Sequence, residues 1–148
     1  VHLIEADNSS YLCSNRKDST YIYMKNIAET YWKRKKMPIP HLLLSDYEGR
    51  NVWSHKGIVH WRGMNICMVT DGYWRNKSAT NLLDIDYMYL CKGYKGEIAP
   101  LQKLFHIKRI VLDASLGDYK SKAYKEECKT LGLDYIDISE KGSFRILL

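Results

Sequence analysis

Short apolar runs, separated by polar and turn-forming residues, constrain the fold of this chain more than any other feature. Three of them, residues 42–44, 66–69 and 110–112, contain only Leu, Ile, Val, Met and Cys. Runs of that length are typical of buried strands and are too short to be membrane-spanning helices. Because other segments have helical spacing, the 148 residues predict one soluble α/β domain, in which helices pack on a mixed β-sheet.

Three segments have the spacing and end signals of helices. The first is predicted from Asp18 to Lys36, because Asp18 can cap it and two prolines follow it. The second, Tyr119 to Leu131, is followed by Gly132, the residue type that favours a helix C-terminus. A shorter third helix is predicted from Gly96 to Phe105, so His106 should lie at its end.

The remaining apolar segments predict short strands. We expect them at residues 2–4, 10–13, 41–44, 51–54, 58–61, 65–70, 86–90, 109–112, 134–138 and 143–147. Glycines between the central strands indicate an antiparallel meander over residues 51–70. Residues 71–83 are polar and are expected to form a loop.

Motifs for hydrolysis, zinc binding and nucleotide binding are absent. The five histidines show no HxH or HExxH spacing, the four cysteines form no CxxC pair, and there is no GxSxG turn or Walker loop. Cys67 and Cys128 fall in apolar patterns typical of small core residues. We therefore expect a non-catalytic module with no cofactor, no metal and no small-molecule substrate.

Three aspartates follow apolar runs within two residues, namely Asp46, Asp71 and Asp113. Ligand sites in α/β sheets gather at the carboxyl ends of strands, so three converging carboxylates could hold Mg²⁺ or Mn²⁺ in a phosphodiesterase. The alternative is that each aspartate caps the next turn by bonding to the nearby backbone. Aspartate is common at strand ends for that reason, and the capping interpretation is the one we favour.

The chain is basic, with a formal net charge of +6, and its twelve tyrosines include several beside lysines. One candidate surface for single-stranded DNA combines the two strand residues Tyr87 and Tyr89 with a loop that contains Lys92, Tyr94 and Lys95. A second candidate is the basic cluster Lys33-Arg34-Lys35-Lys36. The alternative is ordinary packing for the tyrosines and a solvated surface for the lysines.

Five segments of the C-terminal half form a recognisable series: residues 84–96, 110–115, 124–129, 131–135 and 140–144. They resemble the closing strands and helix of the metallo-β-lactamase-like domain of the ComEC family, membrane proteins of bacterial DNA uptake. The ending "EKGSFR" resembles a divergent branch of that family. In the first half, residues 41–46 take the place of the family's "THxHxDH" loop and residues 67–72 that of its "TGD" turn.

The chain departs from this family where metal ligands are expected. Ser45 and Asp46 stand in the first metal loop without a histidine, and Lys92-Gly93 replaces paired histidines in the later turn. Zinc catalysis needs neutral imidazole or carboxylate ligands, so the resemblance implies a reduced, metal-free metallo-β-lactamase-like domain.

The resemblance also implies where and with what the domain acts. The parent would sit in the bacterial cytoplasmic membrane, with this piece in solution beside it. The domain would contact single-stranded DNA, or support transporter assembly through the membrane portion of the same parent. The alternatives are the aspartate-based phosphodiesterase or nuclease and a pure protein-interaction domain, for which an exposed Tyr/Trp patch without lysines would be the mark.

Overall fold

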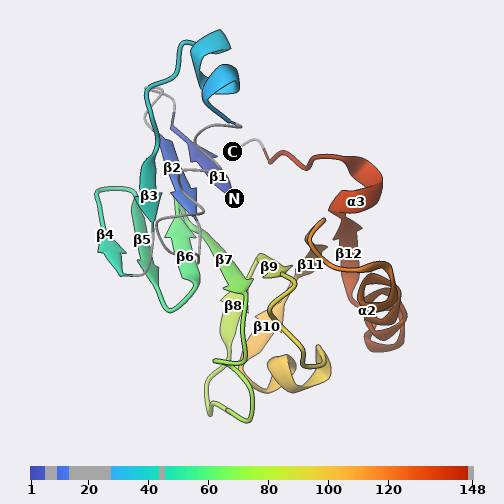
Figure 1. Cartoon of the computed structure of the whole chain (residues 1–148). Helices are drawn as coiled ribbons and strands as arrows, with labels where there is room; N and C mark the ends of the chain where they lie inside the picture. The colour runs from blue at the N-terminus through green and yellow to red at the C-terminus, as the bar shows by residue number, and fades with distance from the viewer. Residues whose placement is uncertain (6–9, 14–27, 44–45, 147–148) are drawn as a thin grey trace. The chain divides into compact units, whose positions relative to one another are not determined.

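The computed structural model describes residues 1–5, 10–13, 28–43 and 46–146 (Figure 1). Its contacts divide the chain into two compact units, Val1–Lys56 and Gly57–Leu148. No helix in the described ranges has both the length and the apolar character needed to span a membrane.

The first unit contains a three-stranded sheet. β1 (His2–Ile4) runs antiparallel to β2 (Ser10–Cys13), which pairs in parallel with β3 (His41–Leu43). β4 (Tyr47–Glu48) and β5 (Val52–His55) form an antiparallel pair. Residues 28–34 are helical, while the predicted start of that helix and the predicted turn at residues 7–9 lie outside the described ranges. Apolar side chains buried in this unit include Leu3, Leu12, Trp32, Leu43 and Val52.

The second unit is organised around a mostly parallel sheet with the strand order β12-β11-β9-β7-β6. They are β6 (Ile58–Trp61), β7 (Met64–Val69), β9 (Tyr87–Leu90), β11 (Arg109–Leu112) and β12 (Asp134–Asp137). β7, β9, β11 and β12 run parallel to one another, so their carboxyl ends share one edge of the sheet. β6 is antiparallel to β7, and the tight turn between them is made by Arg62 and Gly63, both with positive φ.

A smaller parallel pair extends two of these strands. β8 (Leu83–Ile85) precedes β9 with only Asp86 between them, and β10 (Phe105–Ile107) precedes β11 with only Lys108 between them. The 3₁₀ helix η1 (Ala99–Lys103) leads into β10. α2 (Asp118–Leu131) connects β11 to β12, as a parallel crossover requires, and α3 (Ile138–Lys141) follows β12.

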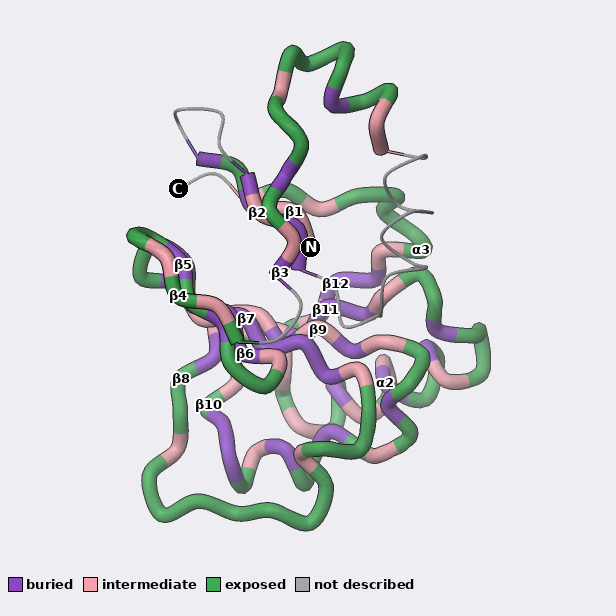
Figure 2. The backbone as a smooth tube through the Cα atoms, turned by 60° about the vertical axis from the view of Figure 1, so that its left-hand side comes forward, coloured by how far each residue is buried: buried purple, intermediate pink, exposed green. Residues whose placement is uncertain are grey.

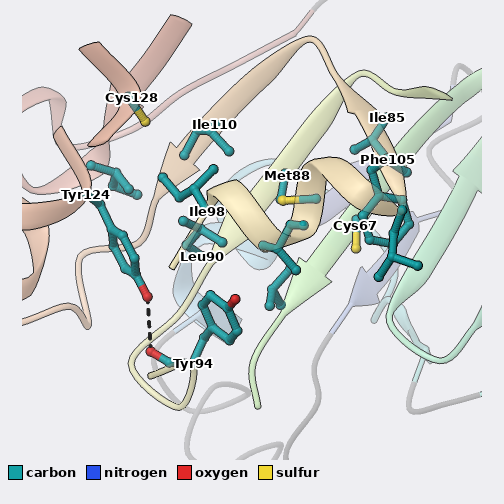
Figure 3. Packing of buried hydrophobic residues seen from close by; sticks show 14 of the residues in the cluster. Cys67, Ile85, Met88, Leu90, Tyr94, Ile98, Phe105, Ile110, Tyr124 and Cys128 are labelled. Carbon is teal, nitrogen blue, oxygen red and sulfur yellow. Dashed lines mark hydrogen bonds between the residues drawn. The ribbon is translucent and has the colours of Figure 1, made fainter. Parts of the chain in front are cut away.

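The core of the second unit is formed by the parallel strands, η1 and one face of α2 (Figure 3). Cys67, Met88 and Cys128 are 0% exposed. Burial raises the pKa of the Cys67 thiol to about 12 and that of Cys128 to about 11, so both stay protonated at neutral pH. This confirms their prediction as small core residues.

The mixed sheet with packed helices confirms the predicted fold class, and several elements are close to their predicted bounds. The helix predicted from Tyr119 to Leu131 is α2, and Gly132 ends it in the left-handed conformation at φ 65°. In the helical segment at residues 28–34, the helix ends two residues before the predicted Lys36. In β3, only Leu43 is buried, so it is less enclosed than expected.

Two predicted elements are wrong. Residues 96–105 are not one helix, because only Ala99–Lys103 turn helically and Phe105 and His106 belong to strand β10. The strand predicted at residues 143–147 is also wrong for its described part, since residues 143–146 are irregular. Just before this segment the chain forms α3, because the Asp137 carboxylate accepts a hydrogen bond from the Ser139 backbone N–H and caps that helix.

Candidate functional site

The carboxyl edge of the parallel strands in the second unit carries the main concentration of predicted site residues. Asp71 follows β7, Lys92 follows β9 and Asp113 follows β11 directly. Three segments leave this edge: the β7–β8 loop (residues 70–82), the β9–η1 loop (residues 91–98) and the short β11–α2 connection (residues 113–117). Most of the β7–β8 loop is exposed (Figure 2). Ligand sites of parallel sheets gather at such an edge, so we take it as the candidate site.

Asp71 and Asp113 both accept hydrogen bonds from the backbone two residues ahead. The Tyr73 N–H donates to Asp71 Oδ1 at 2.8 Å, and the Ser115 N–H donates to Asp113 Oδ1 at 2.7 Å. This is the arrangement that the turn-capping interpretation predicts. Asp46 belongs to the first unit, where its Oδ1 lies 2.8 Å from His55 Nδ1.

No group of three His, Cys, Asp or Glu side chains within the described ranges is arranged to hold a metal ion. At the strand end where the family resemblance implies paired histidines, the chain presents Lys92 and Gly93. An ammonium group is not a ligand for a divalent cation at neutral pH, and glycine offers no side chain. The donor set at this edge therefore does not fit zinc.

The backbones of the two loops approach each other closely. An ideal Cβ built on Gly93 would lie 1.8 Å from the Thr70 carbonyl oxygen, so this position accepts no side chain without a shift of the backbone. The Lys92 N–H donates to Ser115 Oγ at 3.3 Å, which ties the same loop to the end of β11. Glycine thus permits the β9–η1 loop to lie directly on the end of β7.

Helix α2 fixes the rest of the β9–η1 loop. The Tyr124 hydroxyl donates to the carbonyl oxygens of Tyr94 and Gly96, at 3.2 and 3.0 Å. Lys120 Nζ also donates to the Gly96 carbonyl at 3.1 Å. Glu127 Oε1 accepts the backbone N–H groups at the start of η1, those of residues 98 and 99, at 2.6 and 2.9 Å. The loop is therefore held by specific donors and acceptors from α2.

The tyrosines predicted to contact DNA are not equally accessible. Tyr94 is 2% exposed, and its hydroxyl donates to the Glu97 carbonyl at 2.7 Å. Its ring cannot stack on a base, so the prediction of Tyr94 as a DNA contact is wrong. Tyr87 and Tyr89 are half-buried on β9, and the Tyr87 ring lies 5.6 Å from that of Phe144. Burial, with a smaller contribution from Asp113, raises the pKa of Tyr89 to about 12.

The predicted basic residues are exposed. Lys92 and Lys95 extend from the β9–η1 loop on either side of the buried Tyr94. In the first unit, Lys33 forms an ion pair with Glu29 at 2.9 Å, and residues 34–36 are exposed at the end of the helical segment. The exposure that DNA contact requires is therefore present at both basic clusters.

The sequence analysis missed an aromatic and basic group in the β7–β8 loop. Tyr73 is 40% exposed, and Lys77 Nζ lies 3.2 Å from the centroid of its ring. Trp74 contacts Tyr73 edge to face at 4.7 Å and packs its own ring on Phe105 at 5.2 Å. Trp74 thereby anchors the loop while Tyr73 stays accessible. The available signal was an aromatic pair followed by Arg75 and Lys77 in a loop that is otherwise polar.

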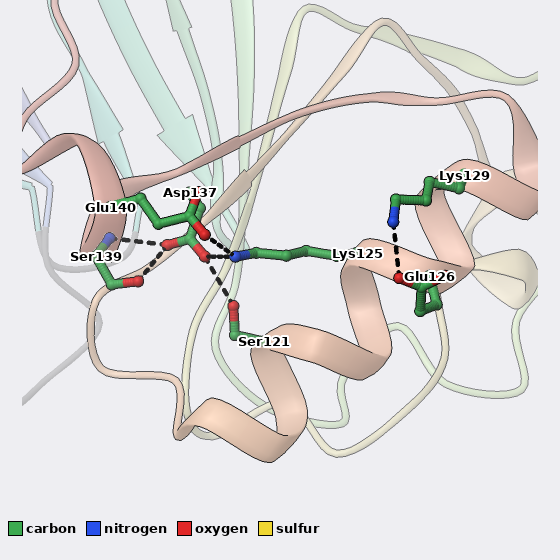
Figure 4. A network of polar contacts seen from close by, with 7 residues as sticks. All are labelled: Ser121, Lys125, Glu126, Lys129, Asp137, Ser139 and Glu140. Carbon is green, nitrogen blue, oxygen red and sulfur yellow. Dashed lines mark hydrogen bonds and ion pairs between the residues drawn. The ribbon is translucent and has the colours of Figure 1, made fainter.

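A second polar network, at the end of β12, was also missed (Figure 4). The buried Asp137 carboxylate receives the ammonium of Lys125, the hydroxyl of Ser121 at 2.9 Å and the N–H and hydroxyl of Ser139. Burial alone would raise the pKa of Asp137, but these donors outweigh it and hold the pKa well below its usual range. Lys125 also pairs with Glu140 at 2.6 Å. All these groups are satisfied, so the network serves to join α2 to α3.

Comparison with known protein families gave one match along the full length of the chain. The family model described as the ComEC C-terminal domain matches residues 1–148. Comparisons with curated proteins and with solved structures gave no match.

Proposed function

The chain belongs to the ComEC C-terminal domain family, which implies a role in competence DNA uptake, and from this premise we propose a non-catalytic domain that contacts incoming single-stranded DNA. In this proposal the domain is a reduced metallo-β-lactamase-like module beside the membrane portion of its parent. The carboxyl edge of the parallel strands, with its two loops, is the contact surface.

One observation carries this proposal. The two edge loops approach closely at Gly93 and Thr70; one carries the exposed Lys92 and Lys95, and the other carries the exposed ring of Tyr73. Proteins that bind single strands combine cations for the phosphates with an aromatic ring for the bases. In the unbound domain, Lys77 lies over the Tyr73 ring. In the proposed complex a stacked base would displace Lys77 from the ring, and the Lys77 ammonium would then contact a phosphate.

The side chains at this edge also bear on affinity and on catalysis. Asp71 and Asp113 follow strands at the same edge as the lysines, so we expect weak binding that salt reduces strongly. Both carboxylates are engaged by backbone N–H groups, and the strand end that would carry histidines has Lys92 instead. These features favour contact with DNA over its hydrolysis.

Fluorescence anisotropy with a labelled single-stranded oligonucleotide, at low and moderate salt, tests DNA contact. We expect binding at low salt and a clear loss of affinity in Lys92→Glu and in Lys95→Glu. Arg62→Glu is the matched control, because Arg62 lies in the turn before β7, at the opposite end of that strand, and the charge change is the same. No binding at low salt, or an equal loss in the control, would contradict the proposal.

Incubation of the protein with a labelled oligonucleotide and either Mg²⁺ or Mn²⁺ tests whether the domain hydrolyses DNA. We expect the oligonucleotide to remain intact over hours with both metals. Hydrolysis that persists through repeated purification and disappears in the double variant Asp71→Asn/Asp113→Asn would establish the metal-dependent phosphodiesterase instead.

A further inference from the structure

Tyr119, in the first turn of α2, is the most exposed large hydrophobic side chain in the described ranges, at 89%. Its side chain makes no hydrogen bond, ion pair or ring contact with another residue that the structure describes. Tyr124 of the same helix is 1% exposed and binds two carbonyl oxygens of the β9–η1 loop. An exposed ring removes almost no apolar surface from water, so packing accounts for Tyr124 but not for Tyr119.

The first turn of α2 lies against the loop that carries the candidate lysines. Lys120, the residue after Tyr119, donates from Nζ to the Gly96 carbonyl oxygen at 3.1 Å. Lys95 directly precedes this glycine and is exposed. The β11–α2 connection, from which the helix starts, follows a strand that ends at the candidate edge. Tyr119 is therefore an exposed ring at the same edge as the lysines.

The β7–β8 loop, which carries Tyr73, reaches the same lysine-bearing loop. The pKa of the Tyr94 hydroxyl is raised by burial and by the Glu127 carboxylate, whereas the Arg75 guanidinium acts in the opposite direction and so lies near it. Arg75 is two residues from Tyr73, and the Tyr94 carbonyl oxygen accepts the Tyr124 hydroxyl of α2 (Figure 3). The β9–η1 loop is thus close to the β7–β8 loop and bonded to α2.

We propose that Tyr119 is a second stacking platform for single-stranded DNA, so that one strand crosses the candidate edge from the Tyr73 ring, over the β9–η1 loop, to the Tyr119 ring. Two exposed rings with lysines on the loop that their segments approach have the composition of a single-strand site. The exposed carboxylate of Asp118 disfavours a phosphate beside Tyr119, which suits contact with a base. This inference rests on the DNA contact proposed above and adds a second aromatic residue to it.

Fluorescence anisotropy of the full chain with a labelled twelve-nucleotide oligothymidylate tests the role of Tyr119. We expect Tyr119→Ala to bind about fivefold more weakly, because one base loses its aromatic partner. Tyr119→Phe keeps the ring and should bind like the wild type. Trp53→Ala is the control, because it removes a ring that is 40% exposed on β5 of the first unit, and it should leave the affinity unchanged. Circular dichroism verifies that the variants are folded.

The double variant Tyr73→Ala/Tyr119→Ala tests whether one strand engages both rings. If it does, the two losses multiply, and the double variant should bind about twenty-five-fold more weakly than the wild type. Stoichiometric titration should give one oligonucleotide per chain. Two oligonucleotides per chain would mean that the rings belong to separate sites and would overturn the proposal.

Photocrosslinking separates this inference from the proposed function on which it rests. An oligothymidylate in which 5-iododeoxyuridine replaces the thymidines should crosslink to both Tyr73 and Tyr119, as mapped by mass spectrometry. Crosslinks at Tyr73 alone, or an unchanged affinity of Tyr119→Ala, would overturn the role of Tyr119 and leave the DNA contact in place. Absence of binding by the wild type at low salt would contradict the DNA contact itself, and the second platform with it.

Discussion

At the scale of single residues, Gly93 is the position where the candidate site depends most on the absence of a side chain. A methyl group there would meet the Thr70 carbonyl, which is backbone and cannot rotate away. We expect Gly93→Ala to lower the free energy of unfolding by about 1–3 kcal/mol, as overpacking does. Urea denaturation measures this, and Gly72→Ala in the adjacent loop should be nearly neutral, because only the flexible Arg75 side chain is near. Equal midpoints for both variants would contradict the close contact.

Asp137 provides a second prediction at this scale. Its pKa is depressed in the folded state, so its ionic contacts stabilise the protein above the ordinary carboxyl pKa and are lost as pH falls toward the folded value. Asp137→Asn should therefore lower the free energy of unfolding by about 2 kcal/mol at pH 7, since Lys125 loses its buried partner. Urea titrations at pH 7, 5 and 3 should show the difference from the wild type shrinking at pH 3. Glu126→Gln, in an exposed pair with Lys129, is the control and should change little at any pH.

At the scale of elements, α2 acts as a brace for the β9–η1 loop. Tyr124→Phe keeps the ring in the core but removes the hydroxyl that binds two loop carbonyls, so we expect a loss of about 1 kcal/mol in stability. Amide hydrogen exchange should become faster in residues 94–97. Tyr119→Phe removes a hydroxyl from a tyrosine that is 89% exposed and should leave exchange unchanged. Unchanged exchange in Tyr124→Phe would mean that Lys120 and Glu127 suffice to hold the loop.

The same elements show how far the sequence predicts this fold. Apolar runs and Gly132 were enough to locate β11 and α2. The spacing of residues 98, 101 and 105 also fits a helix. Phe105 is indeed buried, but it belongs to strand β10, which is separated from β11 by a single residue. Local periodicity cannot reveal that pairing, because it depends on β8, which is far along the chain.

The candidate site was predictable only in part, for a similar reason. Exposure of Lys92 and Lys95 follows from their charge, and the position of Asp71 and Asp113 at one edge follows from strand order. The burial of Tyr94 depends on the carbonyl that accepts its hydroxyl and on its stacking against Tyr124, 6.4 Å away. Such partners are set by tertiary packing, so the sequence could not tell Tyr94 from the exposed Tyr73.

At the scale of the whole molecule, a net charge of +6 would favour DNA binding even without a defined surface, so salt dependence must separate the two cases. If Lys77, Lys92 and Lys95 each neutralise one phosphate of a single strand, log K should fall with log salt at a slope of about −2. Affinity would then drop about twentyfold between 50 and 200 mM salt. Anisotropy titrations at four salt concentrations measure this slope.

The variants identify which charges contribute to the slope. Lys92→Gln and Lys95→Gln should each make it shallower by about 0.7, since one released counterion is lost per phosphate contact. Tyr73→Ala should weaken binding by a factor that is the same at every salt concentration, because stacking releases no counterions. Tyr73→Phe keeps the aromatic ring and should bind with the affinity of the wild type. A slope that changes equally in Arg62→Gln, from the turn before β7, would mean that the overall charge holds the DNA and that the edge loops do not form a site.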